Sequence, residues 1–139
     1  MQVLFIASVA VIAPDPRESR RLYADALGLP LQPPEPNDEY VFSDKIGGSK
    51  HFGVWPLVQA AQACFGTPAW PADRQVPQLS IEFELASVEA VAAGAEELVQ
   101  QGYDLLHQAK TEPWGQTVAR IQTPEGAILG LSYAPWVHE

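Results

Sequence analysis

The sequence predicts an α+β fold in which two tandem βαβββ modules form cup-shaped mixed sheets. The order of one strand, one helix and three strands occurs twice along the 139 residues. Equivalent residues recur at a spacing of roughly seventy-odd positions, which is too long for a solenoid repeat and indicates an internal duplication. A chain of this length buries a core in one domain without disulfides or structural metal.

The first half begins with an apolar strand, LFIASVAVIA, that leads into a helix. Asp15 is a typical N-cap, Pro16 suits the first helical position, and Glu18 completes a capping box. Gly28 marks the end of this helix, because glycine readily adopts the left-handed conformation that terminates helices. A short strand LPLQ, the loop PPEPND and two strand candidates, EYVFSDKI and SKHFGVWPL, follow in that order.

The second half repeats this order after a linker. Its strand QLSIEFEL precedes a helix that opens at Ser87 and stops at Gly102. The three strands that complete it are YDLLHQ, QTVARIQT and AILGLSYAP. Between the halves, VQAAQACFG has helical spacing and TPAWPADRQVP is a proline-broken connection. We therefore expect a single domain made of module 1–56, linker 57–76 and module 77–139.

Alternating polar and apolar residues predict which side of each strand faces its helix. In QLSIEFEL, the apolar residues are expected to pack on the helix, and the polar ones to line the opposite, concave face. The same spacing of two groups these further residues on one face of their strands: Ile6, Ser8 and Ala10; His51, Gly53 and Trp55; Ile128, Gly130 and Ser132. Tyr40 and Phe42 also share a face, which the sequence does not assign. Two such sheets facing each other would enclose a cup.

Charge and composition argue against several classes of partner. The formal net charge of −9 disfavours nucleic acid and anionic membranes, which are bound through clustered Lys and Arg. No apolar run is long enough to span a bilayer, and the first strand lacks the basic region of a signal peptide. The single cysteine, Cys64, cannot form an internal disulfide and is expected to be a small buried residue. These features favour a cytoplasmic protein with neutral or cationic partners, although the charge also serves plain solubility.

Two stretches of the sequence resemble a known family. The segments SVAVIAPDPRESRRLYADALGL and EPWGQTVARIQTPEGAILGLSY are similar to the opening and closing parts of the vicinal oxygen chelate superfamily. That superfamily holds glyoxalase I, extradiol dioxygenases, fosfomycin-modifying enzymes and the bleomycin resistance proteins. The resemblance covers nearly the whole chain and implies the glyoxalase/bleomycin resistance/dioxygenase fold. It implies less about function, because one scaffold hosts unrelated activities.

The resemblance also implies where metal ligands would lie. Metal-dependent members carry His, Gln or Glu on the first and last strand of each module, and these places hold Ser8, Gly53, Ser80 and Gly130 here. None of the four is a credible ligand for a divalent metal. We therefore expect no metal and no cofactor, as in the bleomycin-resistance-like branch. Glycine at two of these places would leave open space for a ligand near the sheet backbone, unless the positions merely drifted after metal was lost.

The candidate ligand-binding residues are Trp55, Gly53, His51, Ser8, Ser80, Glu82, Trp114, Gly130 and Ser132. Trp55 and Trp114 would form aromatic walls for a flat ligand, or else serve in ordinary packing. Glu82 and Glu84 would hold a cationic group or act as a base, unless Glu84 lies at the solvated end of its strand, which is its expected place. His51 would hydrogen-bond a ligand, face solvent, or join Glu82 in a displaced metal site.

These features favour a metal-independent protein that binds or sequesters a small aromatic or cationic molecule, of which an antibiotic is one example. The resemblance further implies an intertwined homodimer. An alternative is a lyase, isomerase or dioxygenase-like enzyme that uses a relocated metal or a carboxylate base such as Glu82. A third reading is a dimerising module without a ligand. Catalytic residues stay unknown at this point, because no phosphate loop, nucleophile elbow or paired-cysteine motif occurs.

Overall fold

The computed structural model describes residues 1–138 and has a mixed α+β fold, as the sequence predicted. Its elements in chain order are β1 (Phe5–Ala13), α1 (Pro16–Arg20), the π-helical turn η1 (Arg21–Ala26), β2 (Val41–Ser43), β3 (Phe52–Pro56), α2 (Leu57–Phe65), β4 (Leu79–Glu84), α3 (Val88–Gln100), β5 (His107–Thr111), β6 (Thr117–Gln122), β7 (Ile128–Tyr133) and the short helix η2 (Pro135–Val137). None of the helices within residues 1–138 is long and apolar enough to cross a membrane.

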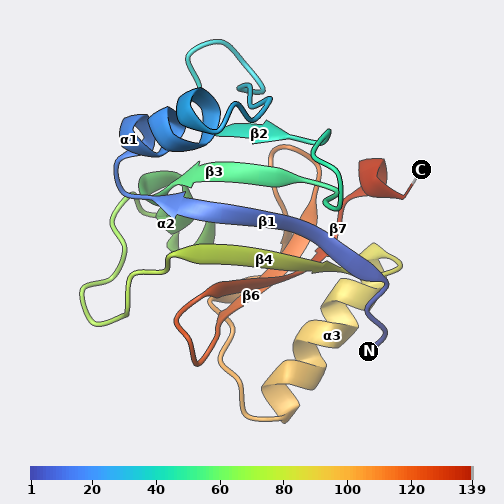
Figure 1. Cartoon of the computed structure of the whole chain (residues 1–139). Coiled ribbons are helices and arrows are strands. Elements are labelled where there is room, and N and C mark those ends of the chain that lie inside the picture. The colour runs from blue at the N-terminus through green and yellow to red at the C-terminus, as the bar shows by residue number, and fades with distance from the viewer. Residues whose placement is uncertain (139) are drawn as a thin grey trace.

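The strands form one seven-stranded sheet in the order β2-β3-β1-β4-β7-β6-β5. Within each half the first strand runs parallel to the last, β1 beside β3 and β4 beside β7. The halves join where β1 pairs antiparallel with β4 (Figure 1). This differs from the expected pair of facing sheets. The difference arises because β1 and β4 each keep one free edge, and pairing these edges satisfies their backbone hydrogen bonds.

Local signals place the helix ends well and the short strands less well. The Asp15 side chain accepts a hydrogen bond from the backbone N–H of Glu18 at 3.4 Å, and the Ser87 side chain caps α3. The expected strand LPLQ is reduced to an isolated bridge between Gln32 and Phe42. The expected strand YDLLHQ begins later, at His107. These segments lie at the outer parts of the sheet, where fewer strand partners define the ends.

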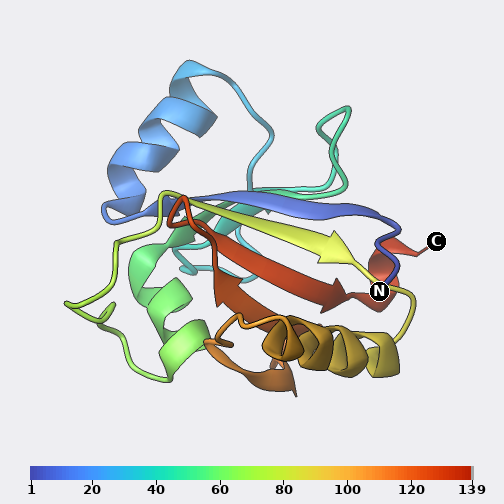
Figure 2. The ribbon, with the colours of Figure 1, turned by 90° about the horizontal axis from the view of Figure 1, so that it is seen from below.

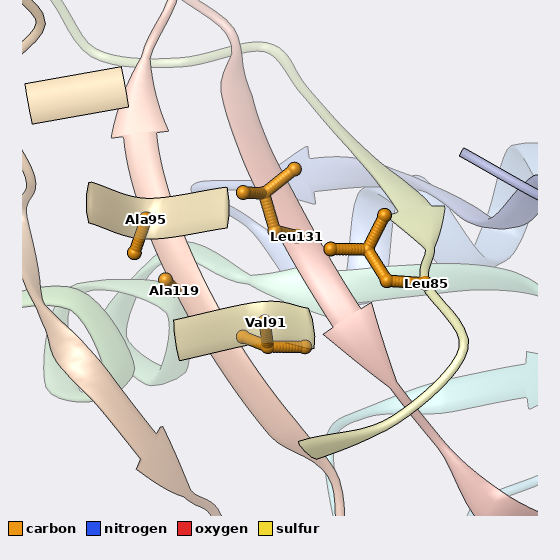
Figure 3. Close-up of a cluster of buried hydrophobic side chains, with 5 residues drawn as sticks. All are labelled: Leu85, Val91, Ala95, Ala119 and Leu131. Atoms are coloured by element: carbon orange, nitrogen blue, oxygen red, sulfur yellow. The ribbon is translucent and has the colours of Figure 1, made fainter. Parts of the chain in front are cut away.

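Helices cover the two faces of the sheet unequally. Figure 3 shows the apolar cluster that joins α3 to one face, formed by Leu85, Val91, Ala95, Ala119 and Leu131. The residues before and after α1 pack on the same face, against Val41 and Val54. On the opposite face α2 packs Ala60 and Cys64 against Ile12 and Ile128. Figure 2 shows β1, β4, β7 and β6 fanning out beside one another. The part of the opposite face that α2 leaves uncovered, here called the concave face, holds the candidate site.

A β-bulge in β1 changes the expected facing of one residue. Ser8 pairs with Glu82 but Ile6 pairs with Phe83, so Ala7 is an extra residue between them. Paired residues point to the same side of a sheet, and Glu82 and Phe83 point to opposite sides. Ile6 therefore lies on the face opposite Ser8, exposed to solvent, and the prediction that it shares a face with Ser8 was wrong.

Candidate ligand-binding cavity

A cavity of about 790 Å³ opens on the concave face. Side chains of both halves of the chain line it, together with the loops before β2 and β6 and the segment after β7. Seven of the nine predicted site residues are among its lining: Ser8, His51, Trp55, Ser80, Glu82, Trp114 and Ser132. The volume is in the range of small-molecule binding sites.

The two predicted glycines do not line the cavity, because neighbouring side chains cover them. A Cβ atom on Gly53 would lie 2.7 Å from the Tyr40 hydroxyl oxygen. A Cβ atom on Gly130 would lie 3.1 Å from Cγ of Glu82 and 3.2 Å from Cγ2 of Val118. The expected open floor is therefore filled. Glycine at these strand positions allows site residues, rather than a ligand, to approach the backbone closely.

Glu82 is held by a network of hydrogen bonds that spans the junction of β1 and β4 and reaches the second half of the sheet. Its Oε1 accepts from the Ser8 hydroxyl at 2.8 Å and from Nε2 of Gln116 at 2.9 Å. The same Gln116 amide donates to Ser132 at 2.9 Å and accepts from the Trp114 indole N–H at 2.9 Å. The network fixes the Glu82 carboxylate and positions Trp114 at the rim. No described residue hydrogen-bonds the other carboxylate oxygen, Oε2.

A second hydrogen-bonded chain lies on the first half. The Tyr40 hydroxyl is bonded to Nε2 of His51, and Nδ1 of His51 lies 2.6 Å from Oδ1 of Asp44. The rings of Tyr40, Phe42 and His51 stack, with the Phe42 and His51 centroids 4.9 Å apart. Burial, and after it the negative charge of Glu82, raises the pKa of the Tyr40 hydroxyl well above its usual value. Tyr40 therefore stays protonated at physiological pH.

The charge of the cavity lining is strongly one-sided. Four carboxylic side chains line it, from Glu35, Asp38, Asp44 and Glu82. Among the lining residues in the described part of the chain there is no Lys or Arg, and His51 is the single basic type. Low-dielectric walls strengthen the field of such charges inside a cleft. The cavity therefore favours neutral or cationic molecules over anions.

Three tryptophans contribute to the walls. Trp55 lies on β3, Trp114 in the turn before β6 and Trp136 in η2. Trp55 is backed by the guanidinium of Arg120, whose Cζ lies 5.5 Å from the indole centroid. Arg120 is 1% exposed and faces Glu112 at 3.5 Å. Trp114 and Trp136 are about half exposed, so they form the rim of the cavity rather than its floor.

Glu84 is fully buried, which corrects its expected place at a solvated strand end. Its Oε2 accepts hydrogen bonds from the Ala134 backbone N–H at 2.6 Å and from Nε2 of His138 at 2.7 Å. Trp136 and Val137, which lie between these two contacts, line the cavity. The chain after β7 thus folds back over the end of β4, and Glu84 anchors this wall.

Several lining residues were not predicted. Tyr40 and Asp44 lie on the cavity side of β2 and its extension, where their spacing of four residues puts them on one face together with Phe42. This alternation was visible in the sequence, but its direction depends on how β2 pairs with β3. Gln116 is the first residue of the expected strand QTVARIQT, whose facing the sequence did not assign, and Trp136 lies beyond the last expected strand.

The residues at the four places where the resemblance implies metal ligands do not fit a divalent metal. Ser8 donates its hydrogen bond to Glu82. Ser80 is buried and its side chain has neither a carboxylate nor an imidazole, and neighbouring side chains cover Gly53 and Gly130. Within residues 1–138, no group of three or more His, Cys, Asp and Glu side chains comes together in a way that could hold a metal ion. His51 and Glu82 line the same cavity, but each is committed to its own hydrogen-bond network.

Comparisons with known proteins agree on one family. The family model described as Glyoxalase/Bleomycin resistance protein/Dioxygenase superfamily matches residues 5–131. The chain is similar to a member of that superfamily from Vibrio splendidus 12B01, at 14% identity and a TM-score of 0.56, covering 94% of this chain and 98% of the other. It is similar to methylmalonyl-CoA epimerase from Mycobacterium tuberculosis, at 18% identity and a TM-score of 0.60, covering 98% and 92%.

A further similarity is to a Mn(II)-bound glyoxalase from Novosphingobium aromaticivorans, at 16% identity and a TM-score of 0.58, over 91% of this chain and 36% of the other. No curated protein matches the sequence. Structural similarity at such low identity establishes the fold and leaves the activity open.

Proposed function

Because the chain belongs to the glyoxalase/bleomycin resistance protein/dioxygenase superfamily, we propose that its cavity binds and sequesters a flat aromatic molecule that is neutral or cationic. The observation that carries this proposal is the combination of aromatic walls with an acidic, Lys- and Arg-free lining. The predicted contacts are Ser8, His51, Trp55, Ser80, Glu82, Trp114 and Ser132. Gly53 and Gly130 act indirectly, by letting Tyr40 and Glu82 lie close to the sheet.

The walls suit a planar ring system. Trp55 is held by Arg120 behind it, and Trp114 is held through its N–H by Gln116, so both indoles are oriented before a ligand arrives. Ordered aromatic side chains lose little conformational entropy on binding, and each stacked ring adds about 0.5–1.5 kcal/mol beyond burial. Phe42 and Tyr40 provide further aromatic surface on the first half.

The polar groups suit a positive or neutral ligand. Oε2 of Glu82 has no hydrogen-bond partner among the described residues, and it is not one of the polar atoms that are fully buried without a partner. It is therefore available to a ligand. An ammonium or amidinium group placed there would be paired with a carboxylate in a site that is partly shielded from water. An anion would instead meet four carboxylates.

We expect the cavity to discriminate by charge. Proflavine, a cationic three-ring dye, should bind about tenfold or more tightly than the anthracene carboxylate anion of similar size, a difference of about 1.4 kcal/mol. Quenching of tryptophan fluorescence on titration measures both affinities. Glu82→Gln should remove most of the preference while leaving binding of a neutral ring compound within about twofold.

Glu125→Gln is the matched control, because Glu125 is an exposed carboxylate that does not line the cavity. It should leave the preference unchanged. Equal affinity for the two dyes, or tighter binding of the anion, would contradict the proposal. A preference that Glu125→Gln removes as fully as Glu82→Gln would show that net charge, rather than the cavity, selects the ligand.

The proposal includes a homodimer and a site without metal, as the bleomycin-resistance-like resemblance implies. Native mass spectrometry of gently purified protein reports the subunit count, any bound metal and any retained organic ligand together. A metal-free dimer that carries an organic mass supports sequestration. One stoichiometric divalent metal per chain would instead favour the alternative, an enzyme of the superfamily whose ligands differ from those at the family positions.

A further inference from the structure

The two polar centres of the cavity differ in kind and face the same space. One is Glu82, a carboxylate with one oxygen held and one free. The other is Tyr40, a buried hydroxyl connected through His51 to Asp44. All four side chains line the cavity. A free carboxylate and a protonated hydroxyl at one site are the parts needed to remove a proton from carbon and to stabilise the negative charge that develops on oxygen.

We propose that Asp44, His51 and Tyr40 form a proton relay into the cavity, and that this relay and Glu82 together interconvert the keto and enol forms of a bound aromatic ketone. The inference rests on the proposed function, because it takes the same flat ligand and gives it an enolisable carbonyl group. Tyr40 and Glu82 are the catalytic residues. His51 and Asp44 are positioning residues that act through Tyr40.

The relay connects the cavity to solvent. Side-chain exposure falls from 50% at Asp44 to 20% at His51, and Tyr40, the last residue of the relay, is also partly buried. With Nδ1–H of His51 donating to Asp44, Nε2 accepts the Tyr40 O–H; when His51 carries a second proton, Nε2–H donates to Tyr40 and frees the hydroxyl hydrogen for a ligand. Tyr40 can thus give a proton to the ligand and recover one from His51 while the ligand blocks direct access of water.

The structure gives Tyr40 a donor's role and Glu82 an acceptor's role. Burial and the charge of Glu82 raise the pKa of Tyr40, so it is a neutral donor rather than a base. The covered glycine Gly53 lets the hydroxyl lie against the sheet, and stacking on Phe42 fixes the ring. Glu82 is restrained through Oε1 by Ser8 and Gln116, and Oε2 keeps no hydrogen-bond partner among the described residues.

The proposed step balances without an oxidant or reductant. Oε2 of Glu82 takes a proton from the carbon next to the ligand's carbonyl, and the electrons of that C–H bond form a carbon–carbon double bond. The carbonyl π electrons move to oxygen, which receives the Tyr40 proton, and His51 restores the proton to Tyr40. Reversal returns a proton from Glu82 to carbon. Because the proton on Glu82 exchanges with solvent before this return, the reaction in D₂O places deuterium on that carbon.

The test uses β-tetralone, a neutral fused-ring ketone, with the full-length protein in D₂O. Proton NMR follows the loss of its benzylic α-proton signal, and saturation transfer in the same sample reports binding. Wild-type protein should accelerate exchange at least about tenfold over buffer. Glu82→Gln should lower the protein-dependent rate about 100-fold and Tyr40→Phe about tenfold or more, with saturation transfer retained. His51→Asn and Asp44→Asn should lower the turnover rate while leaving the half-saturating ketone concentration within about twofold.

Two variants outside the cavity are matched controls: Tyr103→Phe and Glu125→Gln change an exposed tyrosine and an exposed carboxylate and should leave exchange unchanged. Thermal melts confirm that each variant is folded, and Tyr40→Phe keeps the ring that packs on Gly53. Binding of the ketone without accelerated exchange would overturn this inference and leave the proposed function intact. If the ketone neither binds nor exchanges, this inference and the proposed function are both overturned for neutral ketones. The proflavine titration then shows whether the cavity still binds cationic molecules. Exchange that Tyr40→Phe does not change would overturn the relay.

Discussion

The two halves of the concave face share one backbone plan and carry different side chains. Gly53 on β3 and Gly130 on β7 are equivalent positions, each on a strand parallel to the first strand of its own half. Tyr40 fills the space over Gly53, whereas Glu82 and Val118 fill the space over Gly130. The first half therefore contributes an aromatic wall with a hydrogen-bonded relay, and the second contributes a wall of polar and charged groups.

The halves also differ in how they treat charge. The buried charged residues in the described chain, Glu84, Glu112 and Arg120, all belong to the second half. Asp44, the carboxylate of the first-half relay, is half exposed. A duplicated backbone thus fixes where side chains enter the cavity but not what they are. The same arrangement of strands therefore gives the cavity two different walls, an aromatic one from the first half and a polar, charged one from the second half.

The largest effect on stability is expected from breaking the buried ion pair between Arg120 and Glu112, which lies behind Trp55. Arg120→Met removes the partner of Glu112 inside the protein and should lower the free energy of unfolding by about 3 kcal/mol. The cost falls at the low end for a buried pair because Lys110 remains 3.3 Å from Oε1 of Glu112. Urea unfolding followed by circular dichroism measures the loss. Trp55 also loses the guanidinium that backs it, so proflavine affinity should fall with stability.

Arg74→Met is the control, because Arg74 is exposed, and it should change the stability by less than about 0.5 kcal/mol. Combining Arg120→Met with Glu112→Gln should recover part of the loss, since the uncompensated buried charge is then removed. A loss below about 1 kcal/mol for Arg120→Met alone would mean that Glu112 is satisfied without Arg120, and the second half would not depend on buried charge.

A smaller test compares the two covered glycines directly. Gly53→Ala places a Cβ 2.7 Å from the Tyr40 hydroxyl, so Tyr40 must move and its bond to His51 breaks; we expect a loss of about 1–3 kcal/mol. Gly130→Ala meets Glu82 and Val118 at 3.1 and 3.2 Å, which needs shifts of a few tenths of an ångström. The lower entropy of the unfolded alanine chain offsets part of that cost, so its loss should stay below about 1 kcal/mol.

Both variants are compared by urea unfolding under the same conditions. Tyr40→Phe should partly rescue Gly53→Ala, because it removes the atom nearest the new methyl group, and it should not rescue Gly130→Ala. Equal losses for the two alanine variants, or rescue of both, would show that Tyr40 and Glu82 do not depend on the glycines beneath them.

Much of this site was predictable because strand alternation and helix caps are local. The spacing of two in QLSIEFEL placed Ser80 and Glu82 on the concave face, and Asp15 and Ser87 marked helix starts where the structure has them. The wrong prediction for Ile6 also came from strand alternation. A bulge at Ala7 reverses the alternation in β1, and a single inserted residue leaves no local signal in an apolar strand.

The remaining differences come from contacts between distant segments. Glu84 looked solvated because it ends a strand, but residues fifty positions later fold over it. Gly53 and Gly130 were expected to open space, and only the positions of Tyr40 and Glu82 show that the space is filled. The relay needed the pairing of β2 with β3 to bring Tyr40 and Asp44 to His51. Sequence periodicity assigns faces within a strand, whereas these contacts depend on pairing between strands.

The smallest expected effect is a loss of folding stability on acidification. It comes from His107 on β5, the edge strand of the second half. Its Nδ1–H donates to the Gln108 carbonyl at 2.7 Å, so Nε2 carries a lone pair that accepts from Nη1 of Arg120 at 3.1 Å. Burial lowers the pKa of His107 to about 4 from its usual value near 6.5, and Arg120 adds to the decrease. A second proton would put an N–H against the guanidinium.

The sign of the effect follows from proton binding. Between about pH 6.5 and about pH 4 the unfolded chain binds a proton at His107 that the folded chain does not, so folding stability falls as the pH decreases through this window. The contribution is complete above about pH 6.5, and its loss should be about 1 kcal/mol because the imidazole is partly solvated. Urea unfolding at about pH 7 and about pH 4.5 measures it, and His107→Gln should show a smaller decrease than wild type. An identical decrease in both proteins would assign the acid sensitivity to groups other than His107 and would contradict this prediction.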